Sequence, residues 1–233
     1  NRLGNTFAMV RTLATVNDLE GGIVIATEDN TQISLNGGTP VATINAGQSY
    51  RIDGSNYIAQ GTSRHSNMLV TTSKNVYLYQ LVAVGSSNAT CGFNYIPPLN
   101  CFLPRKIDEI PFVNQMPINN VSTVTTGTTI KLNILTEAGA TVLVNGVAPA
   151  ATDGPYTLTG NTNWVTYGIT GVSGNITVES NKAVTAGING GYSTSGYGGY
   201  FAGFSSVPII SKKTGDCIPG LILELDDGYD SYQ

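Results

Sequence analysis

The sequence is poor in the residues on which most enzyme mechanisms depend. Its 233 residues include one histidine, one tryptophan and three cysteines, and only 11% are charged, against roughly 25% in a typical soluble domain. A Ser-His-acid or Cys-His mechanism needs an imidazole base. The one candidate, His65, lies in a polar stretch between predicted strands, where we expect an exposed loop histidine. The cysteines form no close pairs with histidine of the kind that bind zinc. These absences argue against nucleophilic catalysis and against a thiolate metal site.

Long hydrophobic runs and clusters of positive charge are lacking too. No apolar run reaches the roughly 18 residues that a membrane helix needs, so we expect no membrane insertion. The 11 Lys and Arg residues are scattered and the net charge is −4. This distribution gives no electrostatic footprint for a phosphate backbone, so we expect no nucleic-acid partner. The chain begins at Asn1 with neither Met nor a basic and apolar leader, which is typical of a mature product or an excised piece.

The residues that are abundant favour an all-β fold. The chain is 41% hydrophobic, so a disordered chain is not expected, while Thr, Ser, Asn and Gly supply its polarity. Short β-branched segments bounded by Gly, Asn or Asp predict strands. The clearest of them are residues 22–27, 31–35, 75–81, 129–135 and 175–178. No stretch of a dozen residues has convincing helical periodicity.

An internal repeat sets the expected organisation. Residues 26–42 resemble residues 135–151 at an offset of 109, and residues 67–76 resemble residues 175–184 at an offset of 108. Each copy is therefore about 100 residues long, the usual size of a β-sandwich. We predict two tandem repeated antiparallel β-sandwich units. Their expected bounds are residues 1–100 and 101–210, and residues 211–233 would form a connector and the first strand or strands of a further module.

The repeat also predicts turns. Asn36-Gly37 and Asn145-Gly146 separate strand-like residues in the two copies, and Asn-Gly readily adopts the positive φ values of a two-residue hairpin. We expect residues 73–75 and 180–182 to separate the strands of a second hairpin in each copy.

Two motifs resemble a known family. Leu3-Gly4, followed by ATEDNT at residues 26–31, is similar to the opening of IgGFc-binding-protein-like N-terminal regions, which are widespread in Bacteroidota surface proteins. Residues 68–80 resemble that family's "I.ITS.KPV.VYQ" strand pair. The likeness covers roughly residues 1–210. Asn75 replaces the common proline, and residues 91–104 depart from the usual segment.

The tail carries a second resemblance. Residues 217–233 look like the first strands of Ig-like repeats of the same bacteria, which usually pair their first cysteine with a later one. The two resemblances together imply a piece of a long cell-surface adhesin of gliding Bacteroidota, exported by the type IX system. They place the chain outside the cell, associated with the outer membrane through the parent protein.

The cysteines allow two interpretations. In an oxidising compartment Cys91 and Cys101 could close the loop between them, which leaves Cys217 to a partner beyond this chain. The alternative is three buried thiols.

Aromatic and acidic residues supply the candidate sites. Tyr192 and Tyr197 lie in a Tyr- and Gly-rich run and could present flat, amphipathic contact area to sugars or proteins. The other interpretation places them beside a long hairpin loop. Trp164 is either an exposed platform or, as we prefer, a core residue. Calcium is the one cofactor considered, at Asp226, Asp227 and Asp230, where an ordinary Asp-Gly turn would explain the same residues.

Paired carboxylates leave room for a glycoside hydrolase. Adjacent acids on a strand point to opposite faces, so neither Glu28-Asp29 nor Asp108-Glu109 forms a catalytic pair by itself. Glu28 and Glu137 recur at equivalent repeat positions, which favours a shared structural role such as capping a turn.

The sequence thus predicts a non-enzymatic segment of a large secreted adhesin. It would attach to surfaces or glycans, with a role in gliding motility, or act as a structural spacer. Its partners would be a surface polysaccharide or another extracellular ligand and the neighbouring domains of a longer chain. The alternative is a carbohydrate-binding module of a polysaccharide-degrading enzyme, with Tyr192, Tyr197 and Trp164 as stacking residues. A hydrolase built on carboxylates ranks third.

Overall fold

The computed structural model describes residues 3–61, 65–85, 88–101, 103–113, 130–192, 195–201, 209–210 and 223–224. Its description of side chains leaves out residues 84–92, 191–197 and everything from residue 201 on. Strands dominate the described residues, and the antiparallel sheets have a sandwich-like arrangement, so the all-β prediction is confirmed. Within the described part of the chain, no helix has the length and hydropathy needed to cross a membrane.

Strands β1 to β9, which we call the first unit, form one hydrogen-bonded group. They are β1 (Gly4–Val10), β2 (Leu13–Ala14), β3 (Gly21–Ala26), β4 (Thr31–Leu35), β5 (Pro40–Ile44), β6 (Ser49–Asp53), β7 (Ile58–Gln60), β8 (His65–Gly85) and β9 (Asn88–Ile96), with short 3-10 turns η1 (Asn17–Leu19) and η2 (Gly54–Asn56). The long strand β8 joins two layers. Its first half pairs with β1 and β4, and its second half pairs with β3 and β9. The core between the layers includes Phe7, Met9, Val24, Met68 and Leu78.

Strands β10 to β17 form the second unit. They are β10 (Lys106–Ile110), β11 (Ile130–Glu137), β12 (Val142–Val144), β13 (Tyr156–Leu158), β14 (Asn161–Thr170), β15 (Ile176–Ser180), β16 (Val184–Tyr192) and β17 (Ser195–Phe201). One sheet has the order β10-β15-β12 and the other the order β13-β14-β11-β16-β17, with a hydrophobic core between them. The two-residue strands β18 (Ile209–Ile210) and β19 (Leu223–Glu224) pair with each other.

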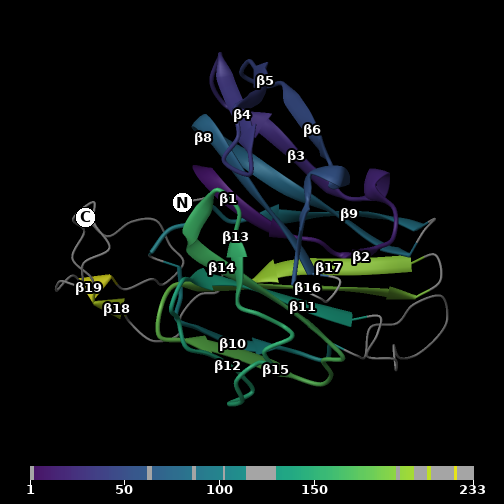
Figure 1. The fold of residues 1–233 in the computed structure, drawn as a ribbon, viewed down its shortest axis with the longest axis vertical. Coiled ribbons are helices and arrows are strands. Elements are labelled where there is room, and N and C mark those ends of the chain that lie inside the picture. Colours follow the sequence, from purple (N-terminus) through teal and green to yellow (C-terminus); the bar gives the residue numbers. More distant parts are fainter. Residues whose placement is uncertain are drawn as a thin grey trace.

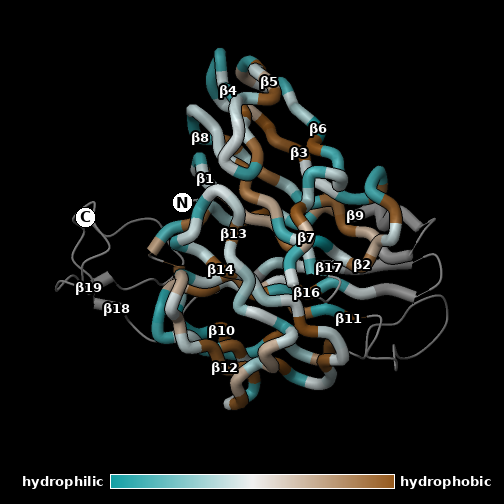
Figure 2. Tube along the Cα trace, in the orientation of Figure 1, coloured by the Kyte–Doolittle hydropathy of each residue, from teal (hydrophilic) through white to brown (hydrophobic). Residues whose placement is uncertain are grey.

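The five-stranded sheet is covered on both faces in its middle. Ile130, Leu132 and Ile134 of β11 belong to the core of the second unit. Leu135 instead shares a third cluster with Ala8, Val10 and Leu69 of the first unit. In Figure 1 the sheet containing β11, β14 and β16 accordingly lies between the β10-β15-β12 layer and the first unit. Figure 2 shows hydrophobic and hydrophilic stretches alternating along the strands, as expected where most strands bury one face.

The two Asn-Gly turns have the predicted conformation. The φ angles are 53° at Asn36 and 76° at Gly37, and 50° at Asn145 and 78° at Gly146. Both asparagines also hold a neighbouring strand at equivalent repeat positions. The Oδ1 atom of Asn36 accepts a hydrogen bond from the Leu69 N–H at 3.0 Å, and that of Asn145 accepts one from the Thr177 N–H at 2.7 Å.

The predicted second hairpins are wrong. Residues 73–75 lie inside the continuous strand β8, and residues 181–183 connect β15 to β16, which belong to different sheets. The polar residues at both places carry the chain around a corner between layers. Ser73 Oγ accepts a hydrogen bond from the Gln32 N–H, and Asn181 Oδ1 accepts the equivalent one from the Thr141 N–H. Local turn chemistry alone does not distinguish such a corner from a hairpin.

Candidate functional site

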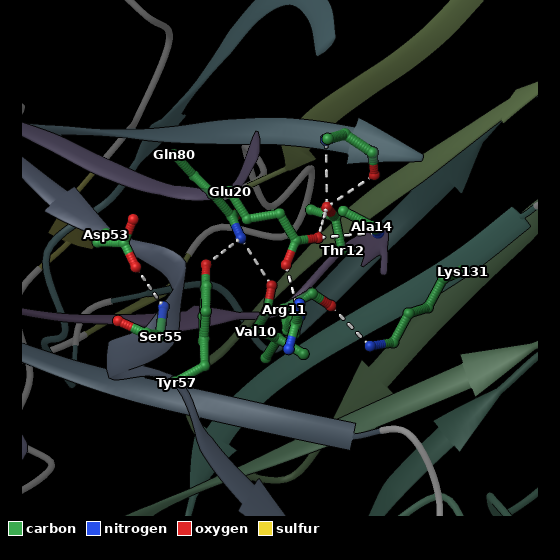
Figure 3. Close-up of polar contacts among 11 residues, drawn as sticks. Val10, Arg11, Thr12, Ala14, Glu20, Asp53, Ser55, Tyr57, Gln80 and Lys131 are labelled. Atoms are coloured by element: carbon green, nitrogen blue, oxygen red, sulfur yellow. Dashed lines mark hydrogen bonds and ion pairs between the residues drawn. The ribbon is translucent and has the colours of Figure 1, made fainter. Parts of the chain in front are cut away.

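A buried ion pair lies where the first unit meets the second. Glu20, just before β3, has a fully buried carboxylate, and Arg11 Nε donates to it at 2.6 Å. The Thr12 hydroxyl and the Ala14 N–H also donate to this carboxylate (Figure 3). Burial raises the pKa of Glu20, while the hydrogen bond from Thr12 and the charge of Arg11 act in the opposite direction. A buried charge persists only when it is paired and hydrogen-bonded in this way.

Lys131 of β11 contacts the backbone of Arg11 from the second unit. Its side chain is only 3% exposed, and its Nζ donates to the Arg11 carbonyl oxygen at 2.7 Å (Figure 3). Burial lowers the pKa of Lys131 to about 8, with the Arg11 charge lowering it further and the Glu20 charge opposing. The ammonium group of Lys131 therefore bridges the two units from a site with little access to water.

His65, the first residue of β8, lies beside Lys131 and is 2% exposed. The expectation of an exposed loop histidine is therefore wrong, because β14 and the Tyr156 ring of β13 cover it. Its Nε2 lies 2.8 Å from Thr166 Oγ1, and its ring stacks on Tyr156 with 4.7 Å between centroids. Burial, followed by the charge of Lys131, lowers the pKa of His65 to about 3. A neutral, anchored imidazole with this pKa is a poor general base at neutral pH.

Arg11, His65 and Lys131 line a cavity of about 620 Å³ between the two units. The first unit contributes Arg11, Thr12, Leu13, Ala14, Thr15, His65 and Ser66, and the second contributes Lys131, Asp153, Gly168 and Thr170. His65 and Lys131 are buried, whereas Thr15 and Thr170 are exposed, one from each unit. The wall therefore combines two cationic residues, Arg11 and Lys131, with the carboxyl group of Asp153 and several hydroxyl groups. Burial also raises the pKa of the Asp153 carboxyl.

A second candidate is the outer face of the β3-β8-β9 layer. Its side chains alternate with those of the core, and all are uncharged: Ile23, Ile25, Tyr77, Tyr79, Leu81, Phe93 and Tyr95. Phe93 is 60% exposed. Tyr79 of β8 and Tyr95 of β9 are direct partners on adjacent strands, and their ring centroids lie 5.9 Å apart in an edge-to-face arrangement. We call these seven residues the outer aromatic face.

The residues singled out in the sequence have different placements. Trp164 is 9% exposed and packs in the cluster between the units, which leaves little ring surface for a ligand. Tyr197 lies opposite Gly190 in the β16–β17 pair, which also contains Tyr192, but the two tyrosine side chains are outside the described part. Asp226, Asp227 and Asp230 lie outside the described residues. Among the described residues, no cluster of three or more His, Cys, Asp or Glu side chains is arranged to hold a metal ion.

Cys101 and the repeated glutamates make structural contacts, whereas Cys217 lies outside the described residues. Cys101 forms a disulfide; the side chain of Cys91, its predicted partner, is outside the described part. Glu28 pairs with Lys74 at 3.6 Å. Glu137 Oε1 accepts a hydrogen bond from the Ala183 N–H at the corner between β15 and β16.

Sequence reasoning missed both the cavity and the outer aromatic face. The signal for the second was present in residues 76–81, where Tyr77, Tyr79 and Leu81 alternate with core residues. The polar residues Lys131 and Asn133 alternate in the same way along a predicted strand. That pattern indicates a second face for the strand, but it does not say that another unit covers this face.

Comparisons with known proteins gave one informative match. A family model described as IgGFc binding protein matches residues 1–190. A comparison with curated proteins gave no match. Among solved structures, an anti-sigma factor domain-containing protein has 9% sequence identity and a TM-score of 0.21, with 82% of this chain and 81% of that chain covered. A second, from Clostridium clariflavum, has 10% identity and a TM-score of 0.22, with 80% and 78% covered. Structural likenesses this weak support no inference.

Proposed function

Since this chain belongs to the IgGFc-binding protein family, we propose that it is a non-enzymatic binding segment of an extracellular adhesin that attaches to glycans. We place the parent adhesin on the surface of a gliding bacterium of the Bacteroidota, exported by the type IX system. The family's name states a ligand of other members, and we do not extend immunoglobulin binding to this chain. Within the adhesin, we propose that residues 1–100 and 101–210 are the two β-sandwich units and that residues 211–233 lead into a further module.

The outer aromatic face is the observation that supports glycan binding most directly. Phe93, Tyr79 and Tyr95 present ring surface from two adjacent paired strands. Aromatic rings pack against the C–H faces of sugars, while tyrosine hydroxyls can bond to sugar hydroxyls. The absence of charge among the seven residues favours a neutral stretch of polysaccharide there. The same face would serve a carbohydrate-binding module of a degrading enzyme, so the test measures binding by this chain and not the activity of its parent.

The test compares two exposed phenylalanines. Phe93 is 60% exposed on the outer aromatic face, and Phe112 is 56% exposed in the second unit, so replacing either with alanine should leave the fold intact. We expect the full chain to bind one or more polysaccharides in a glycan panel saturably. Phe93→Ala should weaken that binding by about tenfold, the size of one lost aromatic contact. Phe112→Ala should bind as the wild type does. Equal binding by both variants, or no saturable binding to any glycan, would overturn the proposal.

Tyr197→Ala in the same assay tests the second proposed contact region, at Tyr192 and Tyr197.

A further inference from the structure

The cavity between the units has the dimensions of a small-molecule site. Its volume of about 620 Å³ lies within the roughly 300–1,000 Å³ usual for ligand pockets. Thr15 and Thr170 are exposed at its edge, whereas Lys131 and His65 are buried. A ligand held here would contact both units at once.

The charges around the cavity favour an anionic ligand beside Lys131. Glu20 is the carboxylate whose charge acts on Lys131, but it already accepts hydrogen bonds from Arg11, Thr12 and Ala14. The Lys131 ammonium itself donates to a neutral oxygen, the backbone carbonyl of Arg11. An ammonium group has three donors, and a buried cation gains most from a paired anion. A ligand carboxylate would provide that anion.

His65 provides a second polar atom without a partner. Its Nδ1 is buried and has no hydrogen-bond partner among the described residues. It faces Gly168, where a Cβ atom would come within 2.3 Å of Nδ1 and 2.9 Å of Lys131 Cε. Both side chains therefore pack directly against the backbone of β14 at Gly168, and only glycine permits this close approach. A buried polar atom of this kind costs free energy until a partner satisfies it.

The remaining polar groups on the wall suit the hydroxyls of a sugar. Thr15, Ser66 and Thr170 carry hydroxyl groups that can donate or accept, and the Asp153 carboxyl can accept. A simple carboxylate would leave most of these groups unused. A sugar acid uses both parts of the wall, the cationic part and the hydroxyl-lined part.

We propose that the cavity between the two units binds a sugar carboxylate, a uronic acid residue, with its carboxylate at Lys131 and its ring hydroxyls at the threonine, serine and Asp153 side chains. The site is separate from the outer aromatic face, so the two proposals can fail independently.

The experiment is a calorimetric titration of the full chain with D-glucuronate, D-glucose and acetate. We expect saturable binding of glucuronate, with glucose and acetate each weaker by about tenfold or more, since each lacks one half of the contacts. Lys131→Met should abolish glucuronate binding. Lys182→Met is the matched control, because Lys182 Nζ also donates to a backbone carbonyl, that of Ala138 at 2.6 Å, but lies outside the cavity lining.

A second variant tests the cavity at its edge, independently of Lys131. Thr170 is exposed at the edge of the cavity, so Thr170→Trp should fold and block entry, with loss of glucuronate binding. Phe93→Ala should bind glucuronate as the wild type does, whatever its effect on polysaccharide binding. Absence of glucuronate binding to the wild type, acetate binding as tight as that of glucuronate, or glucuronate binding that survives Thr170→Trp would each overturn the proposal.

Discussion

At the scale of single residues, the junction between the units is unusual in burying charged and polar groups where apolar ones would pack more simply. Arg11, Glu20 and Lys131 form one connected set, and His65, Asn67 and Thr166 form another beside it. Replacing buried ion pairs with apolar residues is often neutral or stabilising. Of these residues, Arg11, His65 and Lys131 line the cavity, and their presence there is consistent with a binding role for it.

The cost of burying Lys131 can be measured as a pH dependence of stability. The pKa of Lys131 is about 8 in the folded protein, against an ordinary value of 10.5. Between these values the unfolded chain binds more protons, so stability rises with pH across that window. We expect the free energy of unfolding of the wild type, relative to Lys131→Met, to rise by about 3 kcal/mol from pH 8 to 10.5. Arg11, Glu20, His65 and Asp153 face the same region and are present in both proteins.

The measurement is urea unfolding of both proteins at several pH values from 7 to 10.5, in glucuronate-free buffer. Below pH 8 the two stability curves should run parallel, with Lys131→Met the more stable protein because it buries no charge. Curves that stay parallel up to pH 10.5 would show that Lys131 keeps an ordinary pKa and sufficient access to water.

At the scale of elements, contacts between turns of the two units fix how closely the units approach. Gly37 belongs to the Asn-Gly turn after β4, and Gly160 to the turn between β13 and β14. A Cβ atom added at Gly160 would come within 2.5 Å of the Gly37 nitrogen, and one added at Gly37 would come within 2.8 Å of the Gly160 Cα. The two backbones therefore touch, and each side of the contact requires the absence of a side chain.

Gly160→Ala should accordingly destabilise the protein by more than the cost of placing alanine at a positive φ. The φ angle of Gly160 is +86°, and that of Gly171 is +82° with no atom within 4 Å of an added Cβ. Both substitutions to alanine carry the cost of a positive φ, about 1 kcal/mol, but only Gly160→Ala also forces the turns apart. We expect an additional loss of about 1–3 kcal/mol for Gly160→Ala, measured by urea unfolding. Equal losses for the two variants would show that the turns separate without cost.

The elements also show which parts of the fold the sequence could predict. Asn36-Gly37 and Asn145-Gly146 were predictable because a two-residue turn depends on the φ preferences of its own residues. The corners at residues 73–75 and 181–183 were not, because the same polar residues suit a hairpin and a change of layer. The burial of His65 and Lys131 depends on partners about 100 residues away in sequence, such as Thr166 for His65. The cavity is therefore a product of the packing between units, which local patterns do not encode.

At the scale of the whole molecule, a shared hydrophobic cluster joins the two units, so they are not independent domains on a flexible linker. Leu69 and Val10 of the first unit pack with Leu135 and Trp164 of the second, and hydrogen bonds from Asn67 and Lys131 cross the same junction. The middle of the five-stranded sheet has protein on both faces. Separating the units would expose apolar surface and leave buried polar groups without partners, and both effects oppose separation.

We therefore expect the two units to unfold together in a single transition. Leu78→Ala in the core of the first unit and Ile176→Ala in the core of the second each remove a fully buried side chain, at a cost of about 2–5 kcal/mol. If the junction couples the units, both variants lower the midpoint of the same transition in differential scanning calorimetry, and the calorimetric and van't Hoff enthalpies agree. Two transitions, with each variant shifting only one, would show that the junction is weaker than either core. A cavity between such weakly joined units could not hold a ligand in fixed geometry, so this result would also count against a preformed uronate site.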